Sequence, residues 1–261
     1  MDTLDLQMSI VGAYDGIDQL EPIEDTILRT MTQRTWLGRM VNEYGSSFVF
    51  AQFAKQCRQH AATLGFQDRA LARLNEFAQE ERRHGILCGA VVEAFGGTAS
   101  APALQSQPFP FHQEVPPLEG ILRNLLSICC LSETVAVALI AAEREDMPKG
   151  VLRDILTEIW SDECGHAHFG WRQLAAWLPD DTDLKRRLGD YLVIAFEHLE
   201  SHELSHLPLS SKPPQEGAQY GLCSGQEART LFYATVEGII IPNLETYGIP
   251  ARQAWMRRHT A

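Results

Sequence analysis

Residues 160–171 read Trp160-Ser-Asp-Glu-Cys-Gly-His-Ala-His-Phe-Gly-Trp171, and this stretch decides the predicted fold. Within it, Glu163 and His166 are three residues apart, so on a helix both side chains lie on one face, one turn apart. A carboxylate and an imidazole placed in this way can bind one transition-metal ion through an oxygen and a nitrogen. The pair alone is weak support, because a single pair of this kind arises easily by chance.

The same unit occurs earlier in the chain, where Glu81 and His84 are again three residues apart. Each copy also follows a glutamate that lies in an apolar helical segment, Glu43 before the first copy and Glu133 before the second. Because the whole arrangement is repeated, the sequence predicts a metal site built from both copies.

Composition and charge restrict the class of protein. The chain has 261 residues, of which 45% are hydrophobic and 21% charged, and this predicts one soluble globular domain over residues 1–261. The net charge is −12 and basic residues form no cluster, so neither nucleic acid nor an anionic membrane is expected as a partner. No apolar run is expected to reach the roughly 20 residues that cross a membrane.

The chain start and the cysteines predict a cytoplasmic protein. The first residues lack the positive region of a secretory signal. The six cysteines are scattered without a Cys-x-x-Cys pair, which favours reduced thiols over disulfides or a zinc ribbon.

Apolar residues recur with helical spacing along most of the chain, and no long run alternates between apolar and polar residues, so an all-α fold is predicted. Residues 1–23 are interpreted as a loosely packed lead-in, and the proline-rich residues 98–117 as a crossover loop. The predicted helices span residues 24–62, 68–95, 118–145, 149–177, 182–206 and 227–244, with a short one at 251–259.

The spacing of the glutamates predicts how the helices are arranged. Glu81 follows Glu43 by 38 residues, and Glu163 follows Glu133 by 30. Either spacing returns a carboxylate to the same level after a helical hairpin, so two hairpins form a four-helix bundle with four carboxylates and two imidazoles at its middle. Buried acids on this scale require cations. Two divalent ions would neutralise them, and mixed carboxylate and imidazole donors suit iron or manganese.

These six residues resemble the ligand set of the ferritin-like dinuclear carboxylate superfamily. The superfamily includes acyl-carrier-protein desaturases, multicomponent monooxygenases, arylamine N-oxygenases, aldehyde-deformylating oxygenases, rubrerythrins and manganese catalases, and the local sequence is most similar to the desaturases and oxygenases. The resemblance covers about residues 36–178. It implies a ferritin-like bundle over about 24–178, with accessory helices over about 182–261.

The resemblance also implies the composition of the centre. Glu81 with His84 would bind one iron ion, Glu163 with His166 the other, and some carboxylates would bridge both; two manganese ions, or one of each metal, are the alternatives. No catalytic residue beyond the metal site and no organic cofactor is expected. The acids that precede the two pairs would form outer hydrogen bonds, Asp162 to His84 and Glu80 to His166, and so fix the imidazoles.

The activity implied by the resemblance is an O₂-dependent oxidation that hydroxylates, N-oxygenates or desaturates a small organic substrate. The sequence lacks a flavin or NAD fingerprint, so electrons would come from a separate reductase or ferredoxin. A homodimer is expected by analogy alone. The alternative function is iron handling or oxidant scavenging by a ferroxidase, a peroxidase or a manganese-catalase-like protein.

The chain departs from individual members of the superfamily. Arylamine N-oxygenases have an additional histidine where this chain has Ile159, and monooxygenases often have threonine at the position of Val137. Rubrerythrins usually carry a cysteine-rich rubredoxin domain, and this sequence does not. The superfamily is therefore predicted, and a single activity within it is not.

Other histidines and one tyrosine have competing interpretations. The cluster at residues 197–206 contains several His and Glu residues and is either a third metal site or a solvated helix face, of which the solvated face is favoured. His168 lies on a different helix face from His166 and is not predicted to be a ligand. Tyr44, next to Glu43, is predicted to be a packing residue rather than a redox residue.

Overall fold

The computed structural model describes residues 3–102 and 108–260, and its fold is dominated by helices, which confirms the all-α prediction. The predicted crossover loop lies partly outside the described residues, at 103–107. The chain forms two compact units, each assembled from separated segments. Unit 1 comprises Met1–Phe109, Ala142–Ile159 and Lys212–Cys223; unit 2 comprises Pro110–Ala141, Trp160–Ser211 and Ser224–Ala261.

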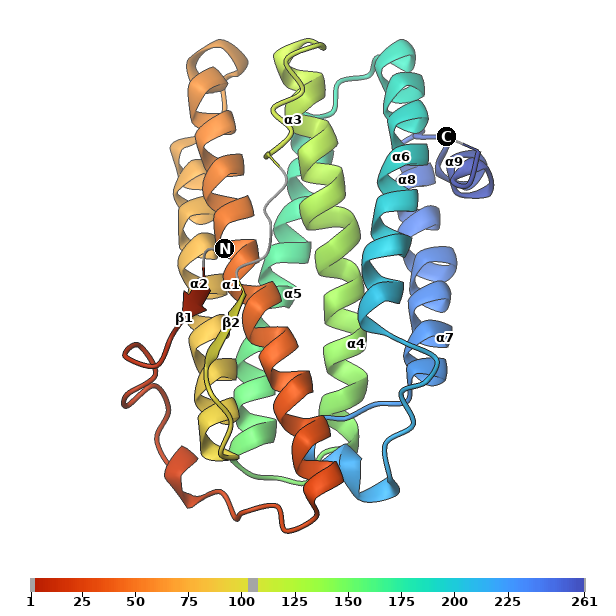
Figure 1. Cartoon of the computed structure of the whole chain (residues 1–261). Helices are drawn as coiled ribbons and strands as arrows, with labels where there is room; N and C mark the ends of the chain where they lie inside the picture. Colours follow the sequence, from red (N-terminus) through yellow and green to blue (C-terminus); the bar gives the residue numbers. More distant parts are fainter. Residues whose placement is uncertain (1–2, 103–107, 261) are drawn as a thin grey trace. The chain divides into compact units, whose positions relative to one another are not determined.

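Unit 1 is built on a hairpin of two long helices, α1 (Thr26–Leu64) and α2 (Asp68–Ala94), which lie side by side (Figure 1). Asp25 begins α1, because its side chain accepts a hydrogen bond from the backbone N–H of Leu28. Gly65 ends it in a left-handed conformation with φ of 70°. Both helices match the predicted ranges to within two residues, because caps and apolar periodicity are local signals.

The two helices of the hairpin approach closely at Gly85. A Cβ atom at this position would lie 2.8 Å from the Cβ of Tyr44 and 3.0 Å from its backbone nitrogen. Further along, the rings of Phe50 and Phe77 pack edge to face with centroids 5.4 Å apart. Since Tyr44 and Gly85 directly follow Glu43 and His84, this approach brings two of the predicted ligands together.

The close approach gives a test of stability with an internal control. We expect Gly85→Ala to destabilise the protein by about 1–3 kcal/mol, because the added methyl group must displace backbone of α1. Gly38→Ala, in α1 but with open space around it, should instead stabilise by about 0.5–1 kcal/mol through its lower backbone entropy. Urea unfolding measures the change in the free energy of unfolding for both variants. Equal changes would contradict the close packing of α1 on α2 at Gly85.

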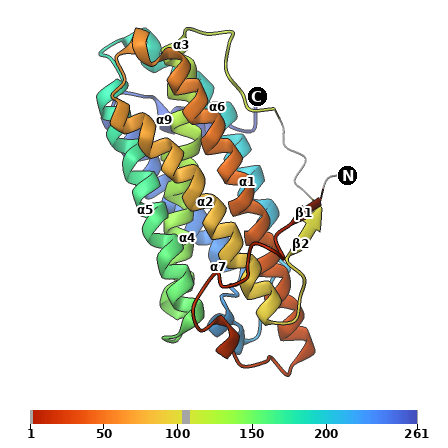
Figure 2. The same cartoon turned by 90° about the vertical axis from the view of Figure 1, so that its left-hand side faces the viewer.

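The lead-in to α1 is anchored, so the prediction of loose packing was wrong. Strand β1 (Thr3–Asp5) pairs antiparallel with β2 (Ser100–Pro102), as Figure 2 shows. The backbone N–H of Leu6 continues the contact by donating to the carbonyl of Ala99 at 2.9 Å, and the Leu6 side chain is buried. Strands of three residues are too short to produce a recognisable alternation of apolar and polar residues.

Unit 2 begins with α3 (Pro117–Leu125), which continues through a π-helical segment, Leu126–Ser132, into α4 (Glu133–Asp146). The sequence predicted one regular helix over this range and missed the π-helical segment. π-Helical turns are rare and occur frequently at functional sites. Here the segment directly precedes Glu133, so it sets the direction in which this predicted ligand points.

Helix α5 (Val151–Trp177) packs tightly on the π-helical segment at Gly170. A Cβ atom on Gly170 would lie 2.5 Å from the Cβ of Cys129 and 2.8 Å from its backbone carbonyl carbon. Because such distances exclude a side chain, the glycine allows contact between the backbone of α5 and the segment before Glu133.

A second π-helical segment, Val236–Ile240, joins α7 (Gly225–Thr235) to α8 (Ile241–Thr246) and contacts the first. Pro242 explains its position, since proline has no N–H and its ring collides with the carbonyl one turn earlier in a regular helix. The sequence predicted an uninterrupted helix over 227–244, so the signal of Pro242 was missed.

The accessory helices of unit 2 pack around α6 (Thr182–His206), which matches its predicted range. Helix α9 (Ala251–Arg257) contacts α6 (Figure 1), with Pro250 so close to Gly189 that a Cβ there would lie 2.3 Å from the ring. The buried Glu200 carboxylate of α6 accepts hydrogen bonds from Arg258 at 2.8 Å and from Tyr233 at 2.8 Å. These bonds attach the end of the described chain to α6.

The continuous run Pro117–Asp146 is long and apolar enough to cross a membrane, with a mean hydropathy of 2.2 in its most apolar window. The expectation that no run reaches this length was therefore wrong. A core helix of a soluble protein has the same properties, and 44% of that window is buried within the protein. The absence of a membrane partner stays a prediction.

Burial of Glu203 on α6 predicts a pH dependence of stability. Burial raises the pKa of this carboxyl to about 7. The folded protein therefore keeps a proton on Glu203 at pH values where the unfolded chain, with an ordinary carboxyl pKa, has released it. The contribution of Glu203 to stability is consequently present at low pH and lost as the pH rises through about 7. Glu203→Gln should be more stable than the wild type at pH 8, by about 1–3 kcal/mol, and similar at pH 4. Thermal unfolding at both pH values checks this, and an equal difference at both would contradict it.

Candidate metal centre

Unit 1 brings together three of the predicted ligands, Glu43 from α1 and Glu81 with His84 from α2. One carboxylate oxygen of each glutamate and one ring nitrogen of the histidine lie within 4.8 Å of one another. The Nδ1 atom of His84 is 3.4 Å from a carboxylate oxygen of Glu43. His84 and Glu81 are 0% and 2% exposed, whereas Glu43 is half-buried, so solvent reaches this triad only at Glu43.

Unit 2 brings together the other three, Glu133 from α4 and Glu163 with His166 from α5. Their ligand atoms also lie within 4.8 Å of one another. The Nδ1 atom of His166 is 3.1 Å from a carboxylate oxygen of Glu163 and 3.7 Å from one of Glu133. All three residues are buried.

The two triads have the same composition and a similar arrangement. In both, the Nδ1 atom of the histidine faces the carboxylate oxygens, although the histidines belong to different units. A neutral imidazole that carries its proton on Nε2 offers the Nδ1 lone pair to a metal and can still donate a hydrogen bond outward. The donor set is therefore two carboxylates and one imidazole in each triad.

Burial of these groups favours a bound cation. Each triad places two carboxylates in or near the interior, where an uncompensated charge is very unfavourable. Imidazole is neutral over much of the physiological pH range and does not balance two negative charges. The buried glutamates and histidines could therefore hold a metal ion, with oxygen and nitrogen donors typical of iron or manganese.

Residues beside the triads fix the ligands through packing. The Arg82 guanidinium lies 5.7 Å from the ring centre of Tyr44, which also packs against Gly85; the role of Tyr44 as a packing residue stays a prediction. Burial raises the pKa of the Cys88 thiol, one turn beyond His84, and the charge of Glu43 adds to this, so Cys88 stays protonated. In unit 2, the indole N–H of Trp171 donates to the hydroxyl of Thr134, next to Glu133, at 3.1 Å.

Glu80 and Asp162, the predicted hydrogen-bond partners of the two histidines, both lie on the helices that carry those histidines. The carboxylate of Glu80 accepts a hydrogen bond from Arg73 at 2.8 Å, and Asp162 is partly buried on α5. Each predicted contact, Asp162 to His84 and Glu80 to His166, joins residues of different units, and both stay predictions. His168 is exposed, in keeping with its exclusion from the ligand set.

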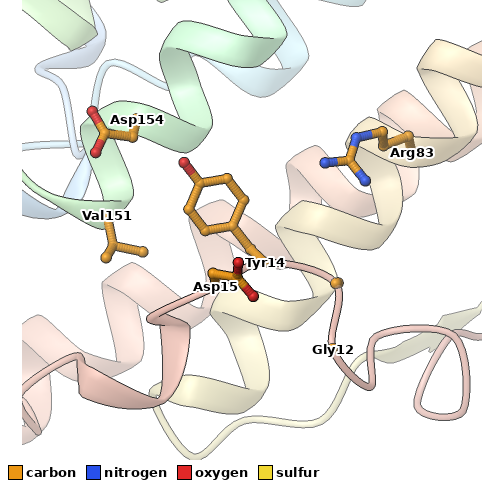
Figure 3. Close-up of a pocket in the computed structure, with 7 residues that line it drawn as sticks. Gly12, Tyr14, Asp15, Arg83, Val151 and Asp154 are labelled. Atoms are coloured by element: carbon orange, nitrogen blue, oxygen red, sulfur yellow. The ribbon is translucent and has the colours of Figure 1, made fainter.

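A separate open pocket of about 520 Å³ lies in unit 1, and the triad residues are not among the described residues that line it. Its lining includes Tyr14, Arg83 and Asp154, and the Tyr14 hydroxyl points toward Asp154 (Figure 3). Burial and then the charge of Asp154 raise the pKa of Tyr14. The pocket is polar and charged, so it is not the apolar substrate cavity that an oxygenase requires.

No model of a known protein family matches the chain, and neither a curated protein nor a solved structure matches it. The resemblance to the ferritin-like superfamily therefore depends on the residues and on the geometry of the two triads.

Proposed function

We propose that the two triads close around a pair of iron ions within a ferritin-like four-helix bundle, and that the protein is an O₂-dependent oxidoreductase. The observation that carries this proposal is that each triad combines a glutamate from one helix with a Glu-x-x-His pair from the next, and that all of these residues except the half-buried Glu43 are buried. Helices α4 and α5 each contribute residues to both units, which supports a shared centre.

In this proposal Glu81 and Glu163 serve both ions. Glu163 is then the fourth donor beside the triad of Glu43, Glu81 and His84, and Glu81 is the fourth donor beside the other triad. Four carboxylates and two divalent ions have opposite and equal charge, so the buried cluster is electrically neutral. Neutrality removes most of the penalty for burying the acids.

The chemistry of the reaction would come from the metal, and the protein would control it. Bound iron supplies one-electron and O₂ chemistry. The glutamates and histidines would hold the ions, and burial of most of these ligands excludes bulk water. Outer hydrogen-bond partners on the remaining ring nitrogens of His84 and His166 would fix the rings.

The proposed reaction hydroxylates, N-oxygenates or desaturates a small organic molecule. Full reduction of O₂ takes four electrons, of which the substrate gives two, so a separate reductase or ferredoxin would give the other two. The products are then the oxidised substrate and water. The cytoplasmic location and the homodimer stay predictions.

Oxygen uptake by the iron-loaded, chemically reduced protein tests this function. We expect the wild type to consume O₂ and His166→Ala to lose uptake by at least about 100-fold, since loss of even an outer partner of a metal ligand reduces activity 10- to 100-fold. His168→Ala is the matched control on the same helix and should behave as the wild type. Equal uptake by both variants would contradict the proposal.

A second assay separates the alternative function. If manganese-loaded protein disproportionates hydrogen peroxide while the reduced iron form consumes no O₂, the protein is an oxidant scavenger and the oxygenase proposal fails.

A further inference from the structure

Helix α6 carries a row of three histidines, His198, His202 and His206, none of which belongs to either triad. The residues are four apart, so they project from one face of the helix at successive turns. All three side chains are exposed. The row is therefore open to solutes, unlike the buried triads.

The imidazole rings of the row contact one another. The ring centroids of His202 and His206 are 4.8 Å apart, and those of His198 and His202 are 6.3 Å apart. Two imidazoles that share one ion have metal–nitrogen bonds of about 2.0–2.1 Å, so their nearest nitrogens lie within about 4 Å. Small ring rotations bring the closer pair, His202 and His206, to this geometry.

The helix limits how many of the histidines can bind one ion. Eight residues separate His198 from His206, which is about 12 Å along the axis at 1.5 Å per residue. The row therefore offers two overlapping pairs that share His202. Only one pair can be occupied at a time, and the shorter separation favours His202 with His206.

Lowered pKa values favour the neutral, metal-binding form of His202 and His206 at physiological pH. Although the residues are exposed, neighbouring protein atoms partly shield the rings from water. This partial desolvation, together with the charges of His206 and His198, lowers the pKa of His202 to about 4. Partial desolvation also lowers the pKa of His206. Protons usually compete with a metal ion for an imidazole nitrogen and so weaken its binding. A metal ion that binds His202 and His206 does not have to displace such protons.

We propose that His202 and His206 form a surface site for a divalent cation of the zinc, nickel and copper group, with water completing its coordination. Two imidazoles four residues apart on a helix are a common half of such sites. Purely imidazole donors suit these metals, whereas the carboxylate-rich triads suit iron or manganese. The site is independent of the proposed oxygenase function, because it shares no residue with the triads.

Zinc titration of the full-length protein by calorimetry tests the site. We expect His202→Ala and His206→Ala each to bind one zinc ion fewer than the wild type, or to bind that ion at least 10-fold more weakly. His60→Ala, which removes a histidine from α1, should match the wild type. Glu163→Ala should retain the ion on α6, and this separates the site from the triads.

The same titration can also overturn the proposal. If His202→Ala binds as many zinc ions as the wild type with the same affinity, the row is only a solvated helix face and the proposal fails. Circular dichroism of each variant shows whether the fold is intact, and the exposure of these histidines predicts that it will be.

Discussion

Replacing Glu81 with alanine is expected to lower the iron content from about two ions per chain to less than one. The same loss is expected for Glu163→Ala, because each carboxylate serves both ions in the proposed centre. Glu43→Ala should lose less, since it removes a ligand of one ion only. Metal analysis of protein purified from iron- and manganese-supplemented cells measures all three variants.

Glu76→Ala is the matched control for this experiment, because Glu76 lies on α2 with Glu81 but forms an exposed ion pair with Arg73. It should retain the iron content of the wild type. Iron that persists in both Glu81→Ala and Glu163→Ala would contradict the assignment of the triads. Two manganese ions in the wild type would instead favour the catalase-like alternative.

Removing the guanidinium of Arg39 is expected to destabilise the protein by about 1–3 kcal/mol, because it leaves a partly buried carboxylate without its charged partner. Arg39 pairs with Glu143 and donates to the carbonyl of Gly221 at 3.1 Å. It also lies 4.9 Å from the ring centre of Trp36, whose indole N–H donates to the carbonyl of Tyr220 at 2.9 Å. Arg39→Ala therefore leaves the partly buried Glu143 charge without its partner and loosens the attachment of residues 212–223 to α1.

Guanidinium unfolding measures this effect. Arg34→Ala, an exposed position on the same helix, should change stability by no more than about 0.5 kcal/mol. If Arg39→Ala is as stable as Arg34→Ala, the ion pair with Glu143 does not contribute as the structure indicates.

Local signals in the sequence predict much of this fold. The range of α6 was predicted from the sequence, and the structure shows the local cause of its start: the side chain of Asp181 accepts hydrogen bonds from the backbone N–H groups of Asp183 and Leu184. The candidate ligands were predicted from the repeated Glu-x-x-His pair, because residues three apart must share a helix face. These inferences need only a few neighbouring residues.

Features that depend on distant residues or on backbone detail were missed. Arg39 and Glu143 are 104 residues apart, and nothing local to either residue indicates the other. The π-helical segment before Glu133 adds a residue to a turn without changing the apolar character of Leu126–Ser132. The division into two units, each formed from separated segments, is likewise a property of long-range contacts. The single domain stays a prediction.

Iron K-edge X-ray absorption of the iron-loaded protein tests the central claim most directly. If the triads of Glu43, Glu81 and His84 and of Glu133, Glu163 and His166 close around one metal pair, the spectrum should contain iron–iron scattering at about 3.5–4 Å. Bound iron with oxygen and nitrogen neighbours but no iron–iron scattering would show that the triads bind ions separately, and would contradict the dinuclear centre.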